Sequence, residues 1–137
     1  MRRALRATVC GLLLAVVAAQ AGCGGGAATL TELQRVKAGT LDVVLLSERT
    51  AVQHGKDTFA FEFRSNGNLI DVGTVKASAN MPMPGMPMFG SIEVQRTAVP
   101  GRYDASGEFS MAGTWRLNVE WDGPAGRGSA GFPGTVQ

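Results

Sequence analysis

The sequence predicts an all-β protein, an immunoglobulin-like antiparallel β-sandwich of about seven short strands preceded by a signal peptide and a flexible tether. Several short runs alternate apolar and polar residues, as half-buried strands do, and Gly or Pro turns separate them. The clearest runs are Phe59–Phe63 and Trp115–Trp121. No segment has a long helical period. The cysteine pair of antibody domains is absent, so the expected likeness is one of architecture.

The expected strands follow one another at near-regular spacing. In order, they cover residues 41–46, 59–64, 69–79, 92–94, 103–109 and 115–121, with a weak final strand through Phe132 and Val136. Turns are expected at residues 65–68, 99–101 and 122–124, where Gly, Pro, Asn and Asp gather. Leu30 to Val36 is expected to form a short helix or a turn of the tether.

The N-terminal segment has the pattern of an export signal. Arg2, Arg3 and Arg6 precede an apolar run from Val9 to Ala19 that is too short to span a bilayer. Two alternative cleavage sites fit this pattern. Residues 19–21 have the small-x-small form of an ordinary signal, whereas residues 21–23 resemble a bacterial lipobox.

The lipoprotein interpretation is favoured, and it makes Cys23 the lipidation site. Small residues precede Cys23 and the glycine run 24–26 follows it, although Gln20 stands where lipoboxes usually carry an aliphatic residue. Cys10 lies inside the signal, so Cys23 would be a lone thiol in an oxidising compartment unless acyl chains modify it. The predicted organisation is a signal peptide at 1–22, a lipid-anchored tether at 23–37 and the β-sandwich domain at 38–137.

This organisation places the mature protein outside the cytoplasm. It would face the periplasm or the extracellular side from a membrane that its lipid anchor binds, or be soluble there if the ordinary site is cleaved. Cleavage removes three of the thirteen basic residues, which leaves ten against eleven acidic ones and a net charge of about −1. Without a basic stripe along the chain, nucleic acid is not an expected partner.

The methionines supply the strongest functional pattern. Met81, Met83, Met86 and Met88 fall within eight residues, separated by prolines and Gly85. The prolines exclude a helix or a central strand, so an extended segment is expected in which methionines two apart face the same way and Gly85 permits a bend. Thioethers are soft ligands, so the four methionines are candidate ligands for Cu(I) or Ag(I).

A second interpretation makes the same methionines structural. Met is a common core filler, and the prolines would then shape a crossover between the two sheets or an apolar docking surface for another protein. Other candidate ligands are few. His54 is expected in a solvated turn, Trp115 and Trp121 are expected in the core, and Met111 could face either the core or the methionines.

Catalysis is not expected. A single histidine, no thiol apart from the one predicted to be lipidated and the absence of a Gly-x-Ser-x-Gly motif leave no set of nucleophile, base and orienting residue. The acidic residues occur singly along the predicted strands. The glycine run 24–26 has neither the preceding strand nor the Lys of a phosphate-binding loop. The protein is therefore predicted not to be an enzyme.

An ordered set of motifs resembles the YtkA-like domain family over residues 38–122. The set consists of Phe59-Ala-Phe61-Glu-Phe63, the Met-Pro segment, Gly101-Arg-Tyr103 and Met111-Ala-Gly113-Thr-Trp115-Arg-Leu117-Asn-Val119. The resemblance implies a small exported β-sandwich, found in lipoproteins and fused to periplasmic adaptor subunits of heavy-metal efflux pumps. Two hypotheses follow: a Cu(I)- or Ag(I)-handling module of the envelope, or a structural or interaction module accessory to an envelope complex such as an efflux system.

Overall fold

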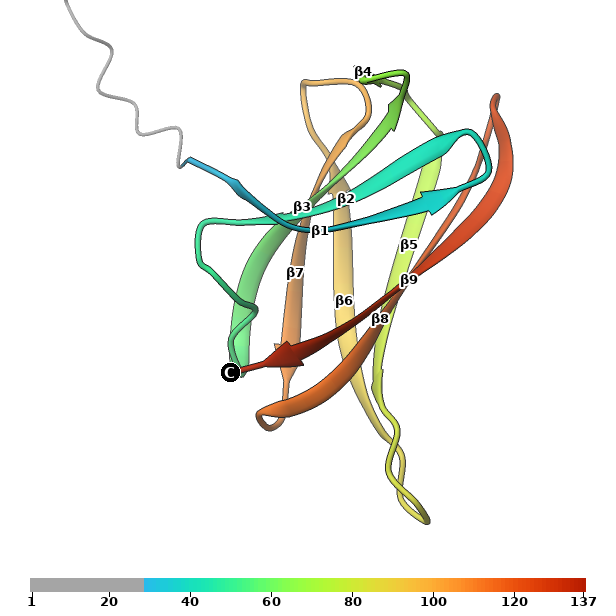
Figure 1. Ribbon diagram of the computed structural model, residues 1–137. Helices are drawn as coiled ribbons and strands as arrows, with labels where there is room; N and C mark the ends of the chain where they lie inside the picture. Colours follow the sequence, from blue (N-terminus) through green and yellow to red (C-terminus); the bar gives the residue numbers. More distant parts are fainter. Residues whose placement is uncertain (1–28) are drawn as a thin grey trace, which may run out of the picture.

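The computed structural model describes residues 29–137, and all of its regular structure is β-strand (Figure 1). The strands are β1 (Thr31–Ala38), β2 (Leu41–Ser47), β3 (Gly55–Ser65), β4 (Asn68–Leu69), β5 (Thr74–Met81), β6 (Met88–Arg96), β7 (Arg102–Phe109), β8 (Gly113–Gly123) and β9 (Gly126–Val136). No helix in this part of the chain is long and apolar enough to cross a membrane. The predicted signal peptide and Cys23 lie outside the described residues.

The strands form one continuous antiparallel sheet that curls on itself. Its order is β1-β2-β3-β7-β6-β5-β8-β9, and the short β4 pairs with β3. In Figure 1, β1 and β2 run across β7 and β6, so the curled sheet has two layers. A parallel bridge between Val52 and Val136 ties the end of β9 to the segment before β3. The predicted all-β antiparallel class is therefore confirmed, with nine strands where about seven were expected.

The prediction of a helix or tether turn over Leu30 to Val36 is wrong, because residues 31–38 form β1 and pair with β2. The helix-like spacing of Leu33 and Val36 has a local cause. Between Glu32 and Gln34 the register shifts, so that Leu33 is the extra residue of a β-bulge and the alternation moves by one position. Both side chains pack against the core. The sheet thus begins at Thr31, inside the segment assigned to the tether.

The core lies between the two layers and is aromatic. Alternate residues of β3 and β8 face inward, as their sequence periods predict, and the Trp115, Phe61 and Phe63 side chains are fully buried. Edge-to-face contacts join neighbouring rings, with centroid separations of 5.3 Å for Phe63 and Trp121 and 5.4 Å for Phe109 and Trp115. The final strand is longer than expected, because β9 pairs with β8 along its whole length.

The side chains on the outward side of β3 are more buried than expected, because the sequence predicted a strand with only one buried side. Ala60 packs with Val44 and Leu46 of β2 in a second small apolar cluster, against which Leu30 lies. Glu62, also on this side, is only 2% exposed. Its carboxylate accepts hydrogen bonds from the guanidinium groups of Arg64 and Arg102. These pairings compensate the burial of its charge.

Candidate functional site

The Met-Pro segment connects β5 to β6 as a β-hairpin. Met81 is the last residue of β5, Met88 is the first of β6, and the two are paired across the strands. Figure 1 shows this hairpin projecting well beyond the rest of the sheet. Since β5 and β6 are neighbours in one sheet, the expectation that the prolines shape a crossover between sheets is wrong. We call residues 81–88 the Met-Pro hairpin.

The tip of the hairpin is a tight turn at Pro84 and Gly85. Gly85 has φ +85°, which matches the second central residue of a type II turn, and Pro is favoured at the first. The predicted bend at Gly85 is therefore confirmed. A β-turn brings its first and fourth residues to within about 7 Å between Cα atoms, and these residues are Met83 and Met86. The turn thus places two methionines directly opposite each other.

Continuing the register from the base to the tip gives two facing pairs, Met81 with Met88 and Met83 with Met86. The observed pairing ends at Met81 and Met88, and residues 82–83 and 86–87 are not strand, so the register fixes the first pair and the turn brings the second pair near each other. The sequence predicted pairs along the chain, Met81 with Met83 and Met86 with Met88, whereas the register across the hairpin sets Met81 opposite Met88. Three prolines stiffen the backbone of this segment, and the stiff backbone limits the positions that the methionine side chains can take.

Exposure divides the four methionines into a base and a tip. Met81 is 6% exposed and belongs to the core cluster, whereas Met83 is 43% and Met86 77% exposed. The end of the Met81 side chain lies against Gly113, where an added Cβ would come within 2.8 Å of its Cε. Met88 is half-buried and packs against the same core. Two of the predicted ligands thus also fill the end of the core.

This set of donors suits a soft ion. Thioether sulfur is uncharged and polarisable, and two or three such groups match the preference of Cu(I). Ag(I) is a soft monovalent ion of the same kind. Hard cations require oxygen ligands, and residues 29–137 contain no cluster of three or more His, Cys, Asp or Glu side chains that could hold a metal ion. Only the methionines therefore offer a group of candidate metal ligands in this part of the chain.

The other predicted candidates lie elsewhere. The Trp115 and Trp121 side chains are 0% and 5% exposed in the core, as expected. His54 is exposed, and its backbone N–H donates to the Gln137 carbonyl at 2.6 Å. Met111 is 42% exposed and does not fill the core, and its carbonyl accepts a hydrogen bond of 3.0 Å from Trp115 Nε1. It supports the position of the indole through its backbone.

Phe89 is a surface feature that sequence reasoning missed. It follows Met88 directly, is 77% exposed, and makes the hairpin base apolar on the side away from the core. The alternation of residues in β6 could have predicted this exposure. Since Ile92 and Val94 point inward, the odd-numbered Phe89 had to point outward with Glu93.

Comparison with known proteins identifies a family. A family model described as YtkA-like matches residues 35–120, which is more than half of the chain and close to the span over which the motifs resemble that family. None of the curated proteins and none of the solved structures compared with the chain matches it.

Proposed function

The chain belongs to the YtkA-like family, and we propose that it is a non-enzymatic accessory domain of the cell envelope that binds Cu(I) or Ag(I) through the tip of its Met-Pro hairpin. The family supports a small accessory domain. The metal assignment rests on Met83, Met86 and Met88, with the buried Met81 as the base that holds the hairpin on the core.

The observation that carries the proposal is the turn at Pro84 and Gly85. It brings the Cα atoms of Met83 and Met86 close together and leaves both side chains exposed, and the prolines restrict the backbone, so less backbone entropy is lost when a metal binds. An open site with two or three neutral ligands favours transfer of the ion to another protein over permanent retention. In this proposal the hairpin collects the metal and presents it at the end of the domain.

The location proposed for the domain follows from the predicted export signal and lipid anchor. Acyl chains on Cys23 would hold the domain at a membrane surface, where it could meet an efflux protein or another envelope component. Mass spectrometry of the mature N-terminus tests this part alone. A mass increase of acyl size on a chain that begins at Cys23 is expected, and an unmodified start at Gly22 would refute the anchor and leave a soluble periplasmic or secreted domain.

Metal binding is tested by titrating the purified protein with Cu(I) in competition with a colorimetric chelator. The double variant Met83→Leu, Met86→Leu should lose competition, because leucine keeps the apolar volume but has no sulfur. Met111→Leu is the matched control, since Met111 is as exposed as Met83 but lies outside the hairpin. Cu(I) should raise the Tm of the wild type and the control only. Equal competition by the double variant would refute the assignment.

A second function is favoured by the exposure of Phe89, which is not a metal ligand. Met86 and Phe89, each 77% exposed, are large apolar side chains on one protruding element, as at protein-docking sites. Docking predicts that Met86→Leu preserves copper tolerance of cells that depend on this protein, whereas Met86→Glu abolishes it. Metal binding predicts that both substitutions reduce tolerance, so the two variants separate the two functions.

A further inference from the structure

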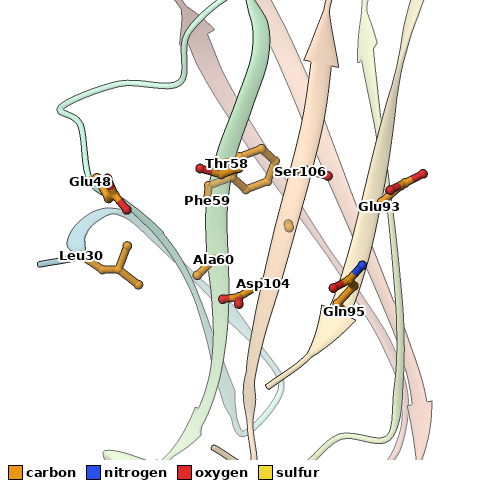
Figure 2. Close-up of a pocket in the computed structure, with 10 residues that line it drawn as sticks. Leu30, Glu48, Thr58, Phe59, Ala60, Glu93, Gln95, Asp104 and Ser106 are labelled. Carbon is orange, nitrogen blue, oxygen red and sulfur yellow. The ribbon is translucent and has the colours of Figure 1, made fainter. Parts of the chain in front are cut away.

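A shallow trough runs along the outer face of β3, β7 and β6, on the side away from the core. We call it the outer trough. Short side chains form its floor, with Thr58 of β3 opposite Ser106 of β7 and Ser106 opposite Glu93 of β6. Figure 2 shows Leu30 and Glu48 on one side of this hollow and Glu93 on the other. The hollow at this end has a volume of about 330 Å³.

The trough continues along the strands toward the Met-Pro hairpin. A second hollow shares Thr58, Glu93 and Ser106 with the first and extends to Ser91 and Glu108. A third shares Ser91 and Glu108 and reaches Phe89. The surface therefore forms one elongated depression about as long as the strands, with an exposed aromatic ring at its end.

Three exposed carboxylates lie in this depression, those of Glu93, Asp104 and Glu108. None of them has a basic side chain within 4.0 Å among residues 29–137. Outside the depression, Asp42, Asp71 and Asp122 each form an ion pair with an arginine, whereas Glu120 on β8 has no such partner among the described residues. The trough thus retains uncompensated negative charge.

The basic groups nearest to the trough do not cancel this charge. Lys56 lies opposite Glu108 in the β3–β7 register, but its ammonium group makes no ion pair within the described part of the chain. Arg49 lies 3.9 Å from Asp57, a buried carboxylate that also accepts the backbone N–H groups of Gln53 and Thr58. With Glu48 on the rim, acidic groups outnumber basic ones along the trough.

The carboxylates are regularly spaced along the strand direction. Asp104, Ser106 and Glu108 lie on the same face of β7, roughly 7 Å apart from one to the next. Glu93 lies beside Ser106 on β6, so it falls midway between the other two carboxylates. One negative charge therefore recurs at roughly every 7 Å. An extended polypeptide presents side chains to one side at the same interval, at every second residue.

From this geometry we infer that the outer trough binds an extended basic segment of a partner protein, with Lys or Arg at alternate positions and an apolar residue against Phe89. The cations would meet Glu93, Asp104 and Glu108 in turn, and the short floor side chains leave space for the backbone. This surface is separate from the methionine thioethers, so the inference stands or falls independently of metal binding. It assigns the domain a protein partner of defined charge.

A labelled peptide in which lysine alternates with serine and ends in phenylalanine tests the inference. Fluorescence anisotropy with the purified protein at low salt should show binding that weakens as salt increases. The triple variant Glu93→Gln, Asp104→Asn, Glu108→Gln should weaken binding about tenfold, since three exposed ion pairs are lost. Glu120→Gln is the matched control, because Glu120 is an exposed carboxylate on β8, outside the trough. Thermal melts check that each variant folds.

Three outcomes would overturn the inference. One is the absence of binding at low salt. Another is equal binding of a peptide of the same composition with its lysines grouped together, which would reduce the effect to general charge attraction. The third is that spermidine binds as tightly as the peptide and that the triple variant weakens its binding to the same extent. The ligand would then be a small polycation. The double variant Met83→Leu, Met86→Leu should leave peptide binding unchanged.

Discussion

Large apolar side chains lie on the inner faces of β3 and β8 and also on the Met-Pro hairpin and the adjoining Phe89, but in opposite environments. The Phe61 and Trp115 side chains are 0% exposed, whereas those of Met86 and Phe89 are each 77% exposed. Burial of apolar area is the main source of folding stability, so the first group should hold the fold together and the second should contribute little. Apolar residues that remain in water on a stiff hairpin are available for a ligand.

The methionines alone show the same contrast between buried and exposed apolar side chains. Met81 and Met86 belong to the same short segment, yet the first packs against Gly113 and the second lies beyond the sheet. Position in the hairpin, not residue type, decides which methionine supports the fold. The contrast is useful because substitutions at the tip can remove a function without unfolding the protein.

Two aromatic residues test this contrast at its extremes. Trp115→Ala should lower the free energy of unfolding by about 3–5 kcal/mol, because it empties the centre of the core and removes the donor to the Met111 carbonyl. Phe89→Ala should change it by less than about 0.5 kcal/mol. Urea denaturation followed by far-ultraviolet circular dichroism measures both. A large loss for Phe89→Ala would mean that the hairpin base is packed, not free.

The two methionines allow a finer comparison. Met81→Ala should destabilise the protein by about 2–4 kcal/mol, because the cavity forms beside Gly113 where β8 begins. Met86→Ala should stay within about 0.5 kcal/mol of the wild type. The same denaturation experiment measures the pair. Similar losses at both positions would show that the whole hairpin, tip included, is part of the core.

Much of the fold could be predicted from the alternation of residues. Phe59 to Phe63 and Trp115 to Trp121 alternate strictly, and both became strands with their aromatic side in the core. The β1 strand could not be predicted in this way, because the bulge at Leu33 shifts its alternation and produces a helix-like spacing. Burial of Glu62 depends on Arg102, which is distant in sequence and meets it only when β3 pairs with β7.

The candidate site was predictable in composition but not in exposure. Prolines and Gly85 indicated a bent, non-helical segment, and the hairpin has that form. The division into a buried base and an exposed tip depends on where β5 and β6 stop pairing, which local sequence does not determine. The outer trough was missed because its carboxylates come from β6 and β7, and only the register brings Glu93 beside Ser106.

Two glycines extend the comparison to smaller effects. Gly128 lies opposite Trp121, and a Cβ at this position would come within 2.3 Å of the indole ring, so Gly128→Ala should cost about 1–3 kcal/mol. Gly85 at the hairpin tip has open space around it, and only its positive φ resists a side chain. Gly85→Ala should therefore cost about 1 kcal/mol. Thermal melts rank the two, and a larger loss at Gly85 would contradict the contrast between core and tip.

The smallest effect concerns charge at the end of the sheet opposite the hairpin. There Asp71 accepts hydrogen bonds from the Gly73 N–H, the Tyr103 hydroxyl and the Arg96 guanidinium group, which joins the loop before β5 to β6 and β7. The Gly73 hydrogen bond, together with the charge of Arg96, lowers the pKa of the Asp71 carboxyl below its usual range. The stability gained is complete above the unfolded pKa of about 3.9, since the carboxyl is then ionised in both states.

As pH falls below that value, the unfolded chain takes up the proton first, and the contribution of Asp71 is lost as pH falls through its folded pKa. Asp71→Asn should therefore be less stable than the wild type at neutral pH, and the difference should shrink below about pH 4. Melts from pH 7 to pH 2.5 measure this change. Met86→Ala, at the uncharged tip, is the control, and its Tm should change with pH in parallel with that of the wild type. If the difference in stability between the wild type and Asp71→Asn grows in acid, the carboxylate does not stabilise this end of the sheet.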